Sequence, residues 1–201
     1  MRCGRGFLLL GVLIVGCTPA GGRRVEAPAL SPQDAAEKAM AEYDGNKDGV
    51  LDAKELEKCP SLKSALPRFD ANSDGKLSKR EIEDKLQGYR DSMTGIVAVP
   101  CRVLVDGRAM SGLSVTFEPE SFLGPSFKPA TGTTEDDGTI SLRTEGYDVE
   151  GLPFGLYRVK VSKMNSSGQE SIPARYNAQT TLGQEIGPDM RGDIVIKVTQ
   201  R

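Results

Sequence analysis

Two hydrophobic periods divide the chain. Between residues 31 and 90 the apolar residues recur every three or four positions, which is the spacing of amphipathic helices. From Val97 onward they alternate with polar residues, which is the spacing of half-buried strands. Gly95 lies where one period gives way to the other. The pattern predicts an α+β multidomain chain in which a small helical part is followed by an antiparallel β-sandwich.

The helical part is expected to begin at Ser31 and Pro32, because serine suits the cap and proline the first turn of a helix. Pro60 should end an earlier helix, since an interior proline costs about 3 kcal/mol. Ser61 is then placed to cap the next helix. The positions expected to form one shared helical core are Ala36, Met40, Tyr43, Leu56, Cys59, Leu62, Leu66, Phe69, Ile82 and Leu86.

The second part contains five alternating runs separated by turn residues, of which Asp106–Gly107 is the clearest. We expect the apolar members of each run to share one face of a strand. These members are Val97, Val99, Cys101, Val103 and Val105; Val115 and Phe117; Ile140 and Leu142; Tyr157, Val159 and Val161; and Ile194, Ile196 and Val198.

Two polar stretches inside the helical part, residues 44–55 and 70–81, repeat one pattern. Oxygen-bearing side chains fall at positions 1, 3, 5 and 9, glycine at position 6 and glutamate at position 12, which is the ligand spacing of a calcium loop. Ordinary polar turns are the alternative, because Asp, Asn and Gly are common in loops. The expected ligands are Asp44, Asn46, Asp48, the Val50 carbonyl, Asp52 and Glu55 in the first loop, and Asp70, Asn72, Asp74, the Lys76 carbonyl, Ser78 and Glu81 in the second.

These residues resemble the EF-hand family over roughly residues 31 to 90. The pattern predicts two bound Ca²⁺ ions, with Leu51 and Leu77 pairing the loops as a short antiparallel bridge. The first loop has four acidic ligands and the second has three, so we expect tighter binding in the first. Pro60 departs from the family pattern by shortening the helix after the first loop. We therefore expect a compact pair without a wide opening on binding calcium.

The second part resembles the carboxypeptidase-regulatory-like or transthyretin-like β-sandwich of many bacterial lipoproteins, over roughly residues 96 to 201. The resemblance implies a mainly non-catalytic module that serves accessory, assembly or adhesion roles. The segments that carry it are Val103-Leu-Val-Asp-Gly107, Gly112-Leu-Ser-Val-Thr-Phe117, Thr134-Glu-Asp-Asp-Gly138, Gly151-Leu-Pro-Phe-Gly-Leu-Tyr-Arg-Val159 and Ile172-Pro-Ala-Arg-Tyr176.

The first residues have the features of a signal peptide: two arginines, then an apolar run too short for a permanent span, which needs about 20 residues. The end of the run, Ile14-Val-Gly-Cys17, resembles the lipobox of bacterial lipoproteins, which implies that Cys17 is lipidated. An ordinary secreted protein is the alternative. The expected division is a signal peptide over 1–16, a flexible tether over 17–30, an EF-hand pair over 31–94 and a sandwich over 95–201.

The composition limits the catalytic groups and the partners that the protein can have. The absence of histidine excludes His-based triads and imidazole acid–base catalysis. Carboxylate pairs such as Asp136 with Asp137, or Glu118 with Glu120, could act as acid and base, but the first is better explained as a turn. A formal net charge of −2 argues against nucleic acid as a partner. We therefore expect a protein without enzymatic activity.

Two features leave alternatives open. Cys59 and Cys101 could form a disulfide in an oxidising compartment, or could pack as small apolar residues. The apolar stretch Ser121–Phe127 could fold back as a lid on the sandwich, or remain an exposed contact for another protein.

The sequence thus predicts a lipid-anchored protein of the bacterial cell envelope, periplasmic or on the cell surface, in which Ca²⁺ structurally clamps an EF-hand pair beside a non-catalytic sandwich. One alternative is a calcium-responsive module that binds an envelope protein or a polysaccharide. Another is an accessory subunit of a secreted hydrolase.

Overall fold

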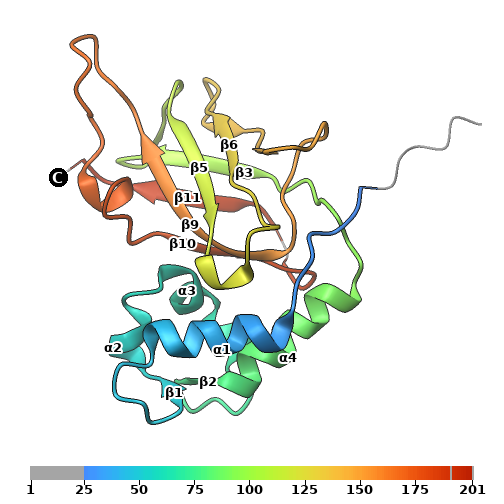
Figure 1. The fold of residues 1–201 in the computed structure, drawn as a ribbon. Coiled ribbons are helices and arrows are strands. Elements are labelled where there is room, and N and C mark those ends of the chain that lie inside the picture. Colours follow the sequence, from blue (N-terminus) through green and yellow to red (C-terminus); the bar gives the residue numbers. More distant parts are fainter. Residues whose placement is uncertain (1–24, 191, 201) are drawn as a thin grey trace, which may run out of the picture.

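The computed structural model describes residues 25–190 and 192–200. A layer of helices packs beneath two β-sheets, and the β1 and β2 strands lie at the outer side of the helices (Figure 1). The chain passes through all four helices before it enters the first strand of the sheets. No helix in these described ranges is both long and apolar enough to span a membrane.

The helical part consists of two helix–loop–helix units. The residues before each unit's loop form α1 and α3, and those after it form α2 and α4. The bounds are α1 Pro32–Tyr43, β1 Val50–Leu51, α2 Ala53–Leu56, α3 Pro60–Phe69, β2 Leu77–Ser78 and α4 Lys79–Asp91.

Prolines set two of these helix boundaries. Pro32 and Pro60 each occupy the first turn of a helix, where the missing N–H costs nothing. The predicted end of the helix before Pro60 is confirmed, because α2 has one turn of four residues. The predicted cap at Ser61 is wrong: Cys59 is the capping residue, and Ser61 lies buried inside α3. Its hydroxyl instead donates to Glu120.

The predicted bridge between the loops is confirmed: Leu51 pairs with Leu77, and Val50 with Ser78, in antiparallel register. Both leucines are fully buried. The predicted helical core is also confirmed, with eight of its ten members buried and the other two, Met40 and Leu66, half-buried against it.

The strands β3 to β11 form two sheets. The first has the order β10–β9–β5–β6–β8, with every neighbouring pair antiparallel. The second has the order β11–β3–β4, with β7 also paired to β3. The bounds are β3 Cys101–Val105, β4 Arg108–Ala109, β5 Ser114–Pro119, β6 Ala130–Thr133, β7 Thr139–Ile140, β8 Arg143–Thr144, β9 Gly155–Ser162, β10 Gly183–Ile186 and β11 Ile194–Val198, with short 3₁₀ turns η1 Ser121–Leu123 and η2 Ala174–Tyr176.

The alternating residues point into one core shared by both sheets, as predicted: Val103 of one sheet and Phe117 of the other are fully buried in it. The Asp106–Gly107 turn is confirmed, and both residues adopt the positive φ that a tight hairpin requires. The first run begins later than expected, because β3 starts at Cys101 and Val97 makes a single bridge to Leu152.

The expectation of purely antiparallel pairing is wrong at β11, which runs parallel to β3 from the Ile194–Cys101 pair to the Val198–Val105 pair. The chain leaves β10 in one sheet and enters β11 in the other. This crossover replaces a hairpin and delivers β11 in the same direction as β3. Alternation alone cannot reveal this, since it is the same for both strand directions.

Both expectations for the segment Ser121–Phe127, a lid on the sandwich or an exposed contact, are wrong. Phe122, Leu123 and Phe127 are buried in the helical core, together with Leu156 of β9. The ring of Phe122 meets that of Tyr43 edge to face, with 6.4 Å between the ring centroids. The segment is therefore neither a lid on the sheets nor an exposed contact, and it joins the sheets to the helices.

The sheets and helices approach most closely where β10 packs against α3. A Cβ on Gly183 would lie 2.0 Å from the carbonyl carbon of Pro60 and 2.2 Å from the nitrogen of Ser61. Both neighbours are backbone atoms and cannot rotate away. Glycine is therefore required at this position to let the two backbones meet.

The two cysteines lie in different cores, Cys59 in the helical one and Cys101 in the sheet one, and both thiols are free. The disulfide alternative is therefore not supported. Burial, together with the charge of Glu120, raises the pKa of Cys59 to about 12. Burial raises the pKa of Cys101 to about 12.

We predict that Gly183→Ala lowers the free energy of unfolding by about 1–3 kcal/mol, because the added methyl group would force the backbones of β10 and α3 apart. Gly88→Ala in α4 is the matched control: its Cβ would meet open space, and alanine favours a helix by about 0.5–1 kcal/mol. Urea unfolding measures both. A Gly183→Ala protein as stable as the parent would contradict the close approach.

We also predict that iodoacetamide at about pH 8 leaves Cys59 and Cys101 unmodified in the native protein, since thiolate is scarce and access is blocked. Both should react in urea. Peptide mass spectrometry without reductant measures this. A peptide pair linked through these two residues, or rapid native labelling of either, would contradict the structure.

Candidate metal centre

The first loop wraps its backbone N–H groups around its own carboxylates. Asp44, which ends α1, accepts a hydrogen bond from the Gly49 nitrogen at 3.0 Å through Oδ2. Asn46 Oδ1 accepts from the Asp48 nitrogen, and Asp48 Oδ1 from the Val50 nitrogen. Gly49 has a φ of 88°, and a Cβ there would meet open space. The glycine is therefore needed for the turn and not for room.

Glu55 closes this loop from the exit side. One of its oxygens accepts hydrogen bonds from the Gly45 and Asn46 nitrogens, and the other from the Asp52 nitrogen. Asp52 in turn caps α2 by accepting from the Lys54 and Glu55 nitrogens. This reciprocal pair is a capping box, which fixes the start of a helix only one turn long.

The second loop repeats this geometry. Asp70 accepts from the Gly75 nitrogen at 2.8 Å, and Glu81 accepts from the nitrogens of Ala71 and Ser78. Ser78 and Glu81 form the capping box that starts α4. Asn72 and Asp74 accept from the backbone as their counterparts do. The two predicted ligand sets therefore lie in loops of matching conformation.

The loops differ at position 1. Asp70 Oδ1 accepts from the Asp74 nitrogen at 3.1 Å. Asp44 Oδ1 is buried and accepts no hydrogen bond, and it is the one buried side-chain oxygen or nitrogen in residues 25–190 and 192–200 that lacks a partner. Leaving such an oxygen unpaired costs about 1–3 kcal/mol, and more for a charged group. A cation is the natural partner for it.

The structure brings the predicted ligands of each loop into one turn, but it does not gather their side chains into a ready-made cluster. Within the described residues, no three acidic or cysteine side chains converge closely enough to hold a metal by themselves. Backbone N–H groups share the carboxylate oxygens of Glu55 and Glu81. With about two acceptor sites per carboxylate oxygen, Glu55 Oε2, which accepts from the Asp52 nitrogen, keeps one site for a cation. The sites of Glu81 are taken by the nitrogens of Ala71, Asn72 and Ser78 and by the Ser78 hydroxyl, so a cation there would replace some of these hydrogen bonds.

A buried carboxylate that sequence reasoning treated as a catalytic candidate joins the sheets to the first loop unit. Glu120 is 3% exposed and accepts from Ser61 Oγ at 2.7 Å, Arg158 Nε at 3.0 Å and Tyr43 Oη at 3.3 Å. Arg158 also donates to the Lys58 carbonyl and to Tyr43 Oη, both at 3.0 Å. Burial, with Cys59 and the charge of Glu120, raises the pKa of Tyr43, which keeps its hydroxyl protonated as a donor.

A second buried carboxylate joins the sheets to the second loop unit. Glu185 of β10 is 4% exposed, pairs with Arg68 of α3 and accepts from the hydroxyl of Tyr89 of α4. Burial and the charge of Glu185 raise the pKa of Tyr89. Sequence reasoning missed this group. Its signal was slight: one acidic residue beside the buried Ile186 in a short strand.

The remaining acidic candidates do not form an acid–base pair. Glu118 pairs with Lys160, away from Glu120. Asp137 accepts from the backbone nitrogen and hydroxyl of Thr139, and these hydrogen bonds lower its pKa. Asp136 and Asp137 thus belong to the turn before β7, as the turn interpretation expects.

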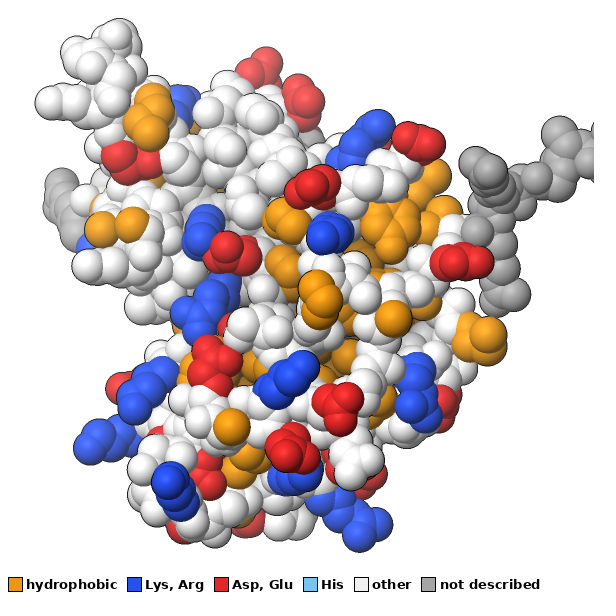
Figure 2. Space-filling view, viewed as in Figure 1, with side chains coloured by type: hydrophobic (Ala, Val, Ile, Leu, Met, Phe, Trp, Pro, Cys, Tyr) orange, Lys and Arg blue, Asp and Glu red, His pale blue; other side chains and the backbone are white. Residues whose placement is uncertain are grey.

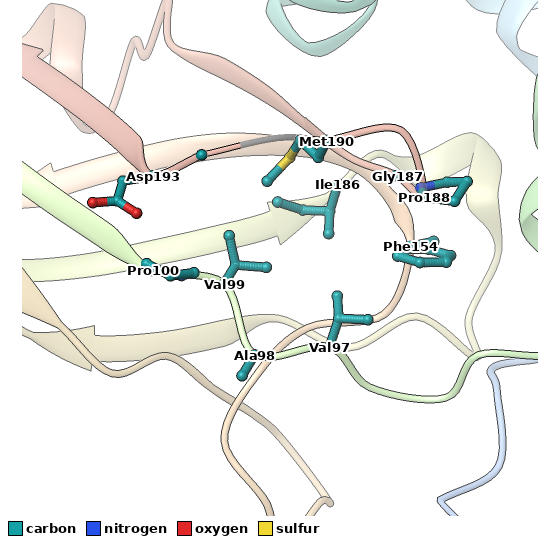
Figure 3. Close-up of a pocket in the computed structure, with 11 residues that line it drawn as sticks. Val97, Ala98, Val99, Pro100, Phe154, Ile186, Gly187, Pro188, Met190 and Asp193 are labelled. Atoms are coloured by element: carbon teal, nitrogen blue, oxygen red, sulfur yellow. The ribbon is translucent and has the colours of Figure 1, made fainter.

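The structure also contains a cavity of about 370 Å³ near one end of the sheets (Figure 3). Its wall is largely apolar, and Asp193 is the acidic residue that borders it. On the face shown in Figure 2, basic side chains are interspersed with acidic ones and do not gather into one patch.

The comparisons with known proteins agree with the geometry of the loops. The family model described as EF hand matches residues 37–60 and 62–86, which contain both loops. No curated protein and no solved structure matches the chain. The helical part therefore carries a pair of EF-hand segments, and this match indicates calcium binding.

Proposed function

We propose that the chain binds two Ca²⁺ ions, one in each loop, and that the ions act as a structural clamp on the helical part. The ligands in this proposal are Asp44, Asn46, Asp48, Val50, Asp52 and Glu55, and Asp70, Asn72, Asp74, Lys76, Ser78 and Glu81, with Val50 and Lys76 contributing carbonyls.

The unpaired oxygen of Asp44 is the observation that carries the proposal. All six predicted ligand residues of the first loop donate or accept hydrogen bonds within that loop, Asp44 through Oδ2, yet Asp44 Oδ1 has no donor. Calcium prefers oxygen ligands and accepts six to eight of them. A cation at position 1 would satisfy the oxygen and draw on the neighbouring carboxylates.

The clamp follows from where the ligands lie. In each loop the first ligand ends the entering helix and Glu55 or Glu81 lies in the first turn of the exit helix. A cation bound by both ends ties the two helices together. At a free calcium level about ten times the dissociation constant, binding adds about 1.4 kcal/mol of stability per site.

The packing of the helices favours a clamp over a responsive module. The apolar face of the helical part is covered by Phe122, Leu123 and Phe127 and by Leu156. A module that docks a partner through that face would first have to release these side chains from the core. The responsive alternative predicts a calcium-dependent rise in the fluorescence of a hydrophobic dye, and the clamp predicts none.

The proposal also covers the two sheets and the N-terminal residues. They enclose one core, and we propose that they form a transthyretin-like sandwich without catalytic activity. We further propose that Cys17 anchors the chain by lipid in the bacterial cell envelope. Cys17 and the predicted signal peptide lie outside the described residues. Metabolic labelling with a fatty-acid analogue, lost in Cys17→Ala, tests the anchor.

We predict two saturable calcium sites in the purified protein by calorimetry, both lost in the double variant Glu55→Gln, Glu81→Gln. Calcium should raise the melting temperature of the parent and leave that of the variant unchanged. Glu57→Gln is the matched control, because Glu57 is an exposed glutamate directly after α2 whose side chain pairs with the exposed Lys63. No heat and no stabilisation at millimolar calcium would contradict the proposal.

We predict that the first loop binds calcium about tenfold more tightly than the second, since it has one more acidic ligand and an unpaired position-1 oxygen. The basic Lys76, Lys79 and Arg80 also lie in and beside the second loop. Titration of Glu81→Gln isolates the first site and Glu55→Gln the second. Equal affinities, or a tighter second site, would overturn this ranking.

A further inference from the structure

We infer that two buried glutamates, Glu120 directly after β5 and Glu185 in β10, are positioning residues for the calcium loops, one for each loop. Glu120 sets the affinity of the first loop, and Glu185 sets that of the second. The inference rests on the proposed function, and it assigns a role in calcium binding to residues outside both EF-hand segments.

Glu120 holds both flanks of the first loop. On the entering side it accepts from Tyr43, the last residue of α1, and the next residue is Asp44 at position 1. On the exit side its ion-pair partner Arg158 holds the Lys58 carbonyl, two residues beyond α2. Because α2 has a single turn, it has little stability of its own. The Glu120–Arg158 pair therefore fixes the end of the unit that carries Glu55.

Glu185 does the same for the second loop. On the entering side it pairs with Arg68, two residues before Asp70. On the exit side it accepts from Tyr89 of α4, the helix that carries Glu81 in its first turn. The ring of Tyr89 also packs edge to face against Phe69, with 6.4 Å between the ring centroids. One carboxylate of the sheet thus links both helices of this unit.

This arrangement determines affinity through preorganisation. The first and last ligands of each loop lie at the ends of different helices. A cation therefore binds most tightly when the two helices are already held at the separation that binding requires. Removing the carboxylate charge leaves an arginine unpaired at the junction and loosens that separation. By linkage, calcium must strengthen the junction by the same factor by which the junction strengthens calcium binding.

The contacts also predict which loop each carboxylate affects more. Glu185 contacts the flanks of the second loop, through Arg68 and Tyr89. Glu120 contacts the flanks of the first, and it reaches α3 at Ser61, nine residues before the second loop begins. The β1–β2 bridge joins the two loops, so a change in the conformation of one loop should partly affect the calcium affinity of the other. The effect should therefore be larger on each carboxylate's own loop.

The experiment is a calcium titration of the purified full-length protein by NMR, in which the amide signals of Gly49 and Gly75 report the two loops separately. We expect Glu120→Gln to weaken the first site about fivefold and Glu185→Gln the second site about fivefold, each with less than about twofold effect on the other site. Glu118→Gln is the matched control, because Glu118 lies two residues from Glu120 and pairs with Lys160 on the surface.

A crossed pattern of this kind is not produced by a general loss of stability. Equal weakening of both sites by each variant, or no change in either, would overturn the inference while leaving the proposed function standing. A parent that binds no calcium would overturn the proposed function as well. If a Glu→Gln variant does not fold, Tyr43→Phe and Tyr89→Phe remove one hydroxyl from each cluster. They must show the same crossed pattern, about twofold in size.

Discussion

The junction between the helices and the sheets depends on Glu120, a charged carboxylate placed where water is excluded. Both of its oxygens are satisfied: Ser61 donates to one, and Arg158 and Tyr43 donate to the other. The pair adds little net stability, because Arg158 is half-buried, but removing Arg158 would leave the buried charge of Glu120 without its partner at a cost of up to about 3–5 kcal/mol. The cluster therefore selects one way of docking the two parts. Apolar contacts from Phe122, Phe127 and Leu156 supply the burial.

This junction determines the surroundings in which the two loops would bind calcium. In an isolated helical pair, the apolar face of the helices would need a second partner to cover it. Here the sheets provide that cover, and Gly183 allows β10 to approach α3 closely enough to complete it. The loops lie on the other side of the same helices (Figure 1). The loops begin α2 and α4, and the Glu120 and Glu185 clusters hold the chain at the far ends of these two helices. In α1, the contact of Tyr43 with Glu120 lies at the same end as the first loop. In the function proposed above, bound calcium would act on a framework whose helix separation is already restricted.

Sequence reasoning predicted the features that are local. The loop spacing, the proline that shortens α2 and the alternating strand faces depend on residues within about a dozen positions, and the periods reveal them. The Leu51–Leu77 bridge joins more distant residues, but they occupy the same position in the two copies of the loop pattern, so the repeat reveals it. It failed where contacts are distant. Tyr43 and Glu120 are 77 positions apart, and Tyr43 and Arg158 are 115 apart, so no period links them. The apolar run Ser121–Phe127 indicated a segment that needs burial. Burial against the sheets, as a lid, met this need as well as burial against the helices did. The parallel β11 could not be predicted for a similar reason, because alternation does not record strand direction.

We expect the helices, sheets and loops to unfold as one unit. Urea unfolding of the purified protein, followed at the same time by amide signals of α1 and of β9 and repeated with and without calcium, measures this. Both sets of signals should disappear in one transition, and calcium should move both midpoints upward by the same amount. A calcium-dependent shift of the α1 midpoint, with that of β9 unchanged, would show that the helices and the sheets are two independent parts.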